Sequence, residues 1–290
     1  MTYRLYQLLA RLPLGVLHSL ASIMAFVIER LAGYRRGVIN SNLLQAFPEK
    51  SPAERKRLRH DFYSNLADTT LEVIKGSELP LDTFRERLTI VNPELLTDLS
   101  DNFQQSVIVL TLHMGNWEWM LHRAAAEYPV SSAFVYKTLH SPDANRFSLE
   151  TRCRFGAHAI EMRDAARDVI KNRRTPRLIF MVADQSPGFR ERVHWTTFLN
   201  QNTAFFSGGA ALARATGFPL AFTYSRRTAR GRYQIELAEI ARDPKSVDED
   251  VLIERYARLT ENAIKASPAD WLWSNRRWKL QQANATKTDE

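Results

Sequence analysis

A histidine and a carboxylate lie five residues apart at the end of an apolar run. The run 106–112 leads into His113, Gly115 permits a sharp turn, and Glu118 follows at the start of the next segment. An imidazole held at the end of a buried strand, with a glutamate one helical turn further on, can act as a general base with its positioning partner. Asn116, between them, is a natural N-cap for a following helix.

The spacing of this pair is weak support by itself. With 7 histidines and 32 acidic residues among 290, about one His-x4-acid pair is expected by chance, and His122 and Glu127 have the same spacing. His113 follows β-branched and apolar residues, which indicate a central strand, although a core histidine at a strand end is the alternative. His122 lies inside a helical pattern without a turn, so we expect it on a helix surface.

A second buried strand pattern also ends in polar side chains. Residues 178–183 are apolar and lead directly into Asp184 and Gln185. These two side chains can bind substrate, or Asp184 can accept backbone hydrogen bonds in a turn, and the sequence leaves both alternatives open. A metal role would need further ligands that the sequence does not reveal, so we expect neither a metal nor a cofactor.

Three cationic residues, Lys137, Arg152 and Arg154, follow the expected strand 130–136. Arginine suits a phosphate or a polarised carbonyl oxygen, whereas most arginines on helices are simply solvated. The candidates for substrate binding are therefore Asn116, Lys137, Arg152, Arg154, Asp184 and Gln185.

Hydrophobic periodicity predicts strands that alternate with helices from about residue 86. The expected strands are 87–91, 106–112, 130–136, 158–161, 178–183, 219–226 and 232–240. The expected helices are 1–33, 36–46, 51–74, 116–128, 142–154, 163–173, 203–216 and 247–266. This order predicts an α/β fold with a mainly parallel central sheet flanked by helices. Ligands bind beyond the carboxyl ends of such strands, where His113 and Asp184 both fall.

Composition narrows the class of partner. Cys153 is the only cysteine, which excludes an intrachain disulfide and fits a reducing compartment. The net charge of +8 suits nucleic acid, an anionic membrane surface or an acidic carrier protein. We expect no nucleic-acid partner, because no helix-turn-helix, zinc-finger or RNP-type pattern is present.

The N-terminal segment points to a membrane. Residues 12–28 contain no Asp, Glu, Lys or Arg, but a spanning helix needs roughly 20 apolar residues. A helix embedded in one leaflet fits better, and a buried helix of a soluble protein is the alternative. Arg35 and Arg36 beside it favour the cytoplasmic face and anionic head groups.

Taken in order, several segments resemble the lipid A late acyltransferase family, which adds secondary acyl chains during bacterial lipopolysaccharide assembly. The resemblance runs from Gly33 to Lys279. His113–Glu118 resembles the catalytic His-x4-Glu motif of that family. The other matching segments are Gly33–Arg36 with Asn40, Asn42, Leu43, Phe47 and Pro48, then Val135–Lys137, Arg152–Gly156, Ala183–Gln185 and Trp273–Lys279. The departures are Lys137-Thr138 in place of Arg-Pro, Asn275 in place of histidine, and a loose match at Thr197–Asn200.

The resemblance implies a membrane-associated O-acyltransferase at the cytoplasmic face of the bacterial inner membrane. Its donor would be acyl carrier protein, with coenzyme A as the alternative, and its acceptor an anionic lipid A precursor. The departures leave open another membrane lipid, such as an amino-lipid or an aryl-polyene anchor. The expected organisation is a membrane-anchoring helix over 1–33, one acyltransferase domain over 34–280 and a disordered tail over 281–290.

In the expected mechanism His113 removes the acceptor's hydroxyl proton while Glu118 holds the imidazole. Arg152 is the first candidate donor to the oxyanion, and the backbone amides of Gly115 and Asn116 are the second. Two other classes of function remain open. A lipid or thioester hydrolase would use water in place of the lipid hydroxyl, and a membrane scaffold would not need His113 at all.

Overall fold

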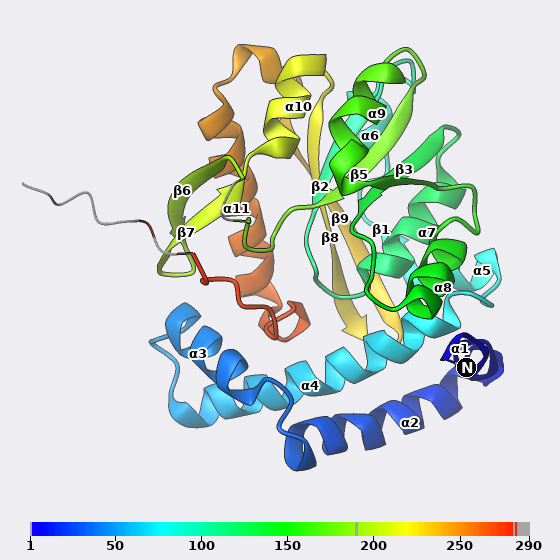
Figure 1. Cartoon of the computed structure of the whole chain (residues 1–290), viewed down its shortest axis with the longest axis vertical. Coiled ribbons are helices and arrows are strands. Elements are labelled where there is room, and N and C mark those ends of the chain that lie inside the picture. The colour runs from blue at the N-terminus through cyan, green and yellow to red at the C-terminus, as the bar shows by residue number, and fades with distance from the viewer. Residues whose placement is uncertain (1, 189–190, 281, 283–290) are drawn as a thin grey trace, which may run out of the picture.

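The computed structural model describes residues 2–188, 191–280 and 282. Its centre is a seven-stranded sheet in the order β1-β9-β8-β2-β5-β3-β4, in which all neighbouring strands are parallel except β8 and β9 (Figure 1). The strands are β1 (Leu88–Ile90), β2 (Val107–Thr111), β3 (Ser131–Tyr136), β4 (His158–Glu161), β5 (Arg177–Val182), β8 (Leu220–Ala229) and β9 (Arg232–Ala241). The predicted α/β class and all seven predicted strands are confirmed.

Helices cover the sheet and extend beyond its carboxyl edge. They are α1 (Thr2–Arg11), α2 (Leu14–Phe26), α3 (Arg36–Ala46), α4 (Pro52–Lys75), α5 (Leu81–Arg87), α6 (Glu94–Leu99), α7 (Trp117–Glu127), α8 (Pro142–Arg152), α9 (Ala165–Lys171), α10 (Gly208–Thr216) and α11 (Glu249–Ala266). Short 3-10 turns lie at Met162–Asp164, Pro244–Ser246 and Pro268–Asp270. The short helices α5 and α6 were not predicted.

The N-terminal helices pack on one another instead of forming one rod. Pro13 separates α1 from α2, because proline lacks the N–H that a continuous helix requires. A π-helical turn, η1 (Val27–Leu31), continues α2. Leu17 and Ala21 of α2 are fully buried against α4. Figure 1 shows α4 crossing below the sheet and α2 running along the outer side of α4.

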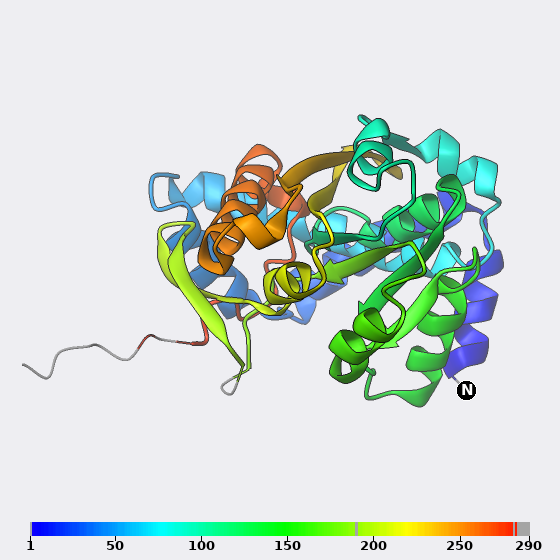
Figure 2. The same cartoon turned by 90° about the horizontal axis from the view of Figure 1, so that it is seen from above.

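A two-stranded hairpin, β6 (Val193–Phe198) and β7 (Gln201–Phe206), was missed in the sequence. The predicted helix over 203–216 was therefore wrong in its first residues, and α10 begins only at Gly208. Leu199 and Asn200 both have positive φ, as a tight hairpin turn requires. Figure 2 shows this hairpin at one side of the molecule, opposite α1.

Candidate functional site

The register of two central strands brings His113 and Asp184 together. In the parallel pair β2 and β5, Thr111 is opposite Val182, so His113 and Asp184 each follow two residues later. His113 Nδ1 lies 2.7 Å from Asp184 Oδ1, and the His113 backbone N–H donates to Oδ2 at 3.1 Å. All five residues of β2 are buried, which fixes this strand end firmly within the sheet.

Asp184 is a buried carboxylate with three donors. Besides its two bonds to His113, Oδ2 accepts the indole N–H of Trp271 at 2.7 Å. Burial acts to raise the pKa of Asp184, but its attraction to His113 and these hydrogen bonds outweigh burial and lower that pKa. Asp184 is therefore ionised at neutral pH and can stabilise an imidazolium.

The same contact fixes the histidine tautomer. An ionised carboxylate can only accept hydrogen bonds, so Nδ1 of His113 carries the hydrogen and Nε2 is left with a lone pair. Gln185 Nε2 lies 3.3 Å from that Nε2 and 3.5 Å from Nδ1, so it is about equally far from both ring nitrogens. The geometry makes His113 suited to be a general base and puts Gln185 beside it.

The turn after His113 is pressed against β8. Gly115 has φ of +56°, and a Cβ there would lie 2.2 Å from the carbonyl oxygen of Ser225, which excludes any side chain. The Gly115 amide donates to Asp270 O at 3.0 Å, and the Asn116 amide donates to Ser225 Oγ at 3.3 Å. Both amides expected as secondary oxyanion donors are thus already bonded within the protein, which corrects that expectation.

Glu118 pairs with Arg152 and not with the imidazole. Arg152 Nε donates to Glu118 Oε2 at 2.7 Å, and Arg152 Nη2 donates to Oε1. Burial alone would raise the pKa of Glu118, yet the Arg152 guanidinium outweighs it and lowers that pKa. Among the described residues the hydrogen bond to His113 Nδ1, expected from Glu118, is made by Asp184 instead.

The other predicted binding residues, Asn116, Arg154 and Lys137, lie in different surroundings. Asn116 is fully buried, and its side chain caps α7 by accepting the Trp119 N–H. Arg154 donates to the backbone carbonyls of Gly76 and Leu79, so its guanidinium is committed to the fold. Lys137 is exposed at the end of β3, and the structure records no bond from it to another described residue.

A largely apolar pocket of about 340 Å³ opens beside these groups. Gly115, Trp117, Glu118 and Arg152 form part of its wall, and the Trp117 ring packs edge-on against His113 at 5.1 Å between centroids. The remaining lining comes from α1, α4, the loop between β3 and α8, α8, β8, β9 and the C-terminal segment: Tyr6, Phe62, Asn65, Leu66, Thr69, Thr70, Val73, Ile74, Leu139, Ala144, Phe147, Ser148, Thr151, Arg227, Tyr233, Ala269, Asp270, Trp271 and Leu272. The apolar walls suit a chain of methylenes.

The C-terminal segment completes the site, and sequence reasoning missed its role. Trp271 is 1% exposed and reaches Asp184, while the Leu272 N–H donates to His113 O at 3.0 Å. Asp270 lines the pocket, and burial raises its pKa to about 6. The one signal available was the aromatic sequence around Trp273, whose composition suits either a membrane interface or a cap on the core. Trp273 is fully buried, as a core cap requires.

His122 is not on the helix surface, so that prediction was wrong. It is 1% exposed, and its ring packs against those of Phe84 and Phe155 at 5.3 and 5.8 Å between centroids. Neither ring nitrogen has a hydrogen-bond partner among the described residues. Burial lowers the pKa of His122 to about 4, because the charged ring cannot be hydrated there. Glu127, the other half of that pair, bonds to Arg123 instead.

His122 should make the fold sensitive to acid. Its pKa of about 4 in the folded protein lies below the ordinary 6.5, so the neutral ring's contribution to stability is present above pH 6.5 and is lost as pH falls towards 4. The loss should approach about 3 kcal/mol. His122→Leu should flatten the decline in the free energy of unfolding between pH 6.5 and 4, measured by denaturant titration. The exposed His140→Leu is the control, and equal slopes for all three proteins would contradict the assignment.

The described residues present no cluster of side chains suited to a metal ion. Over residues 2–188, 191–280 and 282, no group of three or more His, Cys, Asp or Glu side chains is arranged to hold a metal ion.

Comparisons with known proteins identify the family of this chain. The family described as bacterial lipid A biosynthesis acyltransferase matches residues 3–280. The chain belongs to this acyltransferase family. It is also similar to the lipid A biosynthesis lauroyltransferase of Escherichia coli (strain K12), with 20% identity over 273 residues, which cover 94% of this chain and 88% of that protein. The low identity over nearly the whole length is consistent with a divergent member of the acyltransferase family.

Proposed function

We propose that the chain transfers a fatty acyl group from a carrier thioester to a hydroxyl of a lipid A precursor. The observation that carries the proposal is His113 held by the buried Asp184 beside an apolar pocket, in a chain of the acyltransferase family. A base whose Nε2 carries a lone pair and a site for an alkyl chain are the two elements that such a transfer requires.

In the proposed reaction His113 Nε2 takes the hydroxyl proton as the oxygen attacks the thioester carbonyl. A carbon–oxygen bond forms, the carbon–sulfur bond breaks, and the proton passes from the imidazolium to the leaving thiolate. Asp184 stabilises the imidazolium between these steps, in the way that a buried carboxylate supports a catalytic histidine in other acyl-transfer sites.

Arg152 is the proposed donor to the developing oxyanion. Its Nε and Nη2 bond with Glu118, but a guanidinium has five N–H donors, so this ion pair fixes the side chain without exhausting it. Glu118 thereby acts through Arg152, which lines the pocket. This assignment gives the His-x4-Glu spacing a role different from the direct contact expected in the sequence.

The donor is proposed to be acyl carrier protein, with coenzyme A as the alternative. The net charge of +8 suits an acidic carrier and an anionic acceptor. Phe62, Leu66 and Val73 in the pocket wall would hold the acyl chain, and each buried methylene would contribute about 0.8 kcal/mol.

We propose that the protein works at the cytoplasmic face of the bacterial inner membrane. Among the described helices, Leu14–Leu31 is long and apolar enough by length and composition to cross a membrane, which is weak support on its own. Only 22% of that segment is buried, unlike a core helix. A groove between the end of this segment and α4 carries more cationic than acidic side chains and would attract anionic head groups. Its lining is Glu29, Arg30, Ala53, Lys56, Arg57 and His60.

The exposed apolar face of α2 should carry membrane binding. Ile23 and Phe26 are 62% and 58% exposed, so the double change Ile23→Glu/Phe26→Glu should strongly weaken co-sedimentation with anionic phospholipid vesicles. The matched control is Ile170→Glu/Val251→Glu, which adds the same charge at exposed apolar residues of α9 and α11. Equal binding of both double variants would contradict the membrane assignment to α2.

The proposed function is tested by radiolabelled acyl transfer from acyl carrier protein to a total bacterial lipid extract, with His113→Ala as the inactive control. A labelled lipid A precursor that is absent with the variant supports the proposal. Another labelled lipid keeps the chemistry but changes the acceptor. Free fatty acid without acceptor indicates a hydrolase, and label only from coenzyme A thioesters changes the donor. Equal label with both proteins refutes the role of His113.

A further inference from the structure

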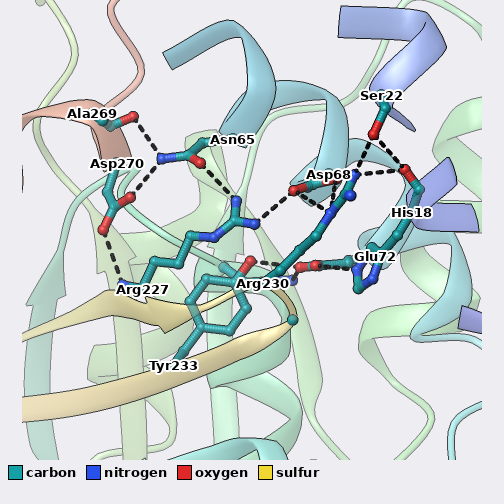
Figure 3. Close-up of polar contacts among 12 residues, drawn as sticks. His18, Ser22, Asn65, Asp68, Glu72, Arg227, Arg230, Tyr233, Ala269 and Asp270 are labelled. Atoms are coloured by element: carbon teal, nitrogen blue, oxygen red, sulfur yellow. Dashed lines mark hydrogen bonds and ion pairs between the residues drawn. The ribbon is translucent and has the colours of Figure 1, made fainter. Parts of the chain in front are cut away.

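Glu72 of α4 is fully buried, and its side chain joins three other elements (Figure 3). Oε1 lies 2.9 Å from His18 Nε2 of α2. Oε2 accepts the Asn116 side-chain N–H at 3.0 Å and the Tyr233 hydroxyl at 2.6 Å. The Glu72 carbonyl accepts the Trp119 indole N–H at 2.8 Å. One carboxylate thus connects α2, the start of α7 and β9.

The bond from Asn116 to Glu72 decides which way the Asn116 amide faces. Asn116 Oδ1 accepts the backbone N–H of Trp119 at 3.0 Å, and this bond caps α7. With the Asn116 oxygen on the Trp119 N–H, the NH₂ group of the same buried amide faces the other side and needs an acceptor there. Glu72 supplies that acceptor.

The cap in turn fixes the turn that carries His113. Gly115 lies against Ser225 of β8, Asn116 follows it, and α7 begins at Trp117. The ring of Trp117 packs against the His113 imidazole at 5.1 Å between centroids. A change in the Asn116 cap would therefore be passed to the side chain beside the base.

The α2 side of this arrangement is held by a second buried carboxylate. Arg230, in the turn between β8 and β9, bonds to Asp68 through both Nε and Nη2. The same Nη2 donates to the carbonyl of His18 and to Ser22 Oγ at 2.9 Å (Figure 3). Arg227 also donates to Asp68, at 2.6 Å. The bond from Arg230 to the His18 carbonyl holds His18 in line with Glu72.

We propose that Glu72 is a positioning residue for the catalytic turn and that His18 makes α2 part of the same arrangement. The proposal rests on the proposed function, because only that function makes the turn catalytic and α2 a membrane helix. The contacts among Glu72, His18 and Asn116 are independent of it. It assigns α2 a second role beyond membrane contact. Through His18 and Glu72, α2 helps to position Asn116, which caps α7 next to His113.

Four single variants of the full chain in detergent micelles test this. Glu72→Met keeps the size of the side chain but leaves Asn116 and Tyr233 without their acceptor. Glu72→Gln keeps an oxygen for these two donors and presents an NH₂ group to His18, so it should rescue the position. His18→Ala cuts only the link to α2. Ser22→Ala, one turn further along α2, removes a contact to Arg230 and leaves Glu72 untouched.

The direct readout is hydrogen exchange of the Trp119 amide, resolved with overlapping peptides over 113–125, because this N–H bonds to the Asn116 cap. We expect exchange about tenfold faster in Glu72→Met and several-fold faster in His18→Ala, with Glu72→Gln and Ser22→Ala near wild type. Transfer turnover should fall in the same order, with KM for the donor unchanged. A thermal melt of each variant shows whether the chain remains folded.

The outcomes separate the two proposals. Faster exchange in Glu72→Met and His18→Ala supports positioning even if the wild type transfers no acyl group, which would refute only the proposed function. Unchanged exchange with lower turnover would overturn positioning, because Glu72 would then act in another way. Equal effects of His18→Ala and Ser22→Ala would overturn the specific link through Glu72.

Discussion

Replacing His113 by alanine should lower the turnover of acyl transfer by a factor of about 10²–10⁴, the usual contribution of a positioned general base. His113 Nε2 is the atom proposed to accept the hydroxyl proton, and among the described residues no other imidazole lies against Asp184. The fold should survive, since the His113 ring is at a strand end with 20% of its side chain exposed. Steady-state rates with labelled donor, alongside a thermal melt, give the measurement.

His122 provides a matched control for the His113 variant. His122→Ala removes a ring of the same kind from the next helix, where it packs among aromatic side chains. It should change stability and leave the chemical step nearly intact. Full turnover in His113→Ala would show that His113 is not the base. An equal loss of turnover in His122→Ala and His113→Ala would show the same.

Replacing Asp184 by asparagine should reduce turnover by a comparable factor. The asparagine NH₂ group would face His113 Nδ1, so Nδ1 would become the acceptor and Nε2 would carry the hydrogen. That tautomer cannot accept the hydroxyl proton, a loss known from other sites in which an asparagine replaces the carboxylate behind the histidine. The pH profile should also change, because the imidazolium loses its buried counter-charge.

Glu118→Gln is the control for the Asp184 variant. Glu118 bonds to Arg152, so its replacement should weaken the positioning of that guanidinium and leave the His113 tautomer unchanged. We therefore expect Glu118→Gln to keep the wild-type pKa on the acidic limb of the pH profile, where His113 must lose its proton, whatever its loss of turnover. A shifted limb with Glu118→Gln and an unshifted limb with Asp184→Asn would reverse the two roles.

The sequence was enough to predict the sheet and to put His113 and Asp184 at the same edge of it. Hydrophobic runs ended at His113 and Asp184, and parallel neighbours place their carboxyl ends at one edge. The family was also recognised from motif order, in agreement with the match over residues 3–280. These features are local, or follow from a general rule about parallel sheets.

The partner of each side chain could not be predicted in the same way. Glu118 is near His113 in sequence, but the strand register puts Asp184, 71 residues away, on the imidazole. His18 and Glu72 are 54 residues apart, and only the packing of α2 on α4 brings them together. The β6–β7 hairpin was missed because its aromatic residues also fit a helix. Such pairings depend on tertiary packing that local propensity does not encode.

Trp271 has a consequence for synthesis on the ribosome. Its indole bonds to Asp184, and its neighbours Asp270 and Leu272 bond to the turn at Gly115 and His113. Translation proceeds from the N-terminus, so α2 is made long before the residues that complete the active site. If α2 binds the bilayer and His113 is the base, as proposed, a nascent chain meets the membrane while that base is still unsupported. Acyl transfer should begin only after about nine-tenths of the polypeptide has left the exit tunnel.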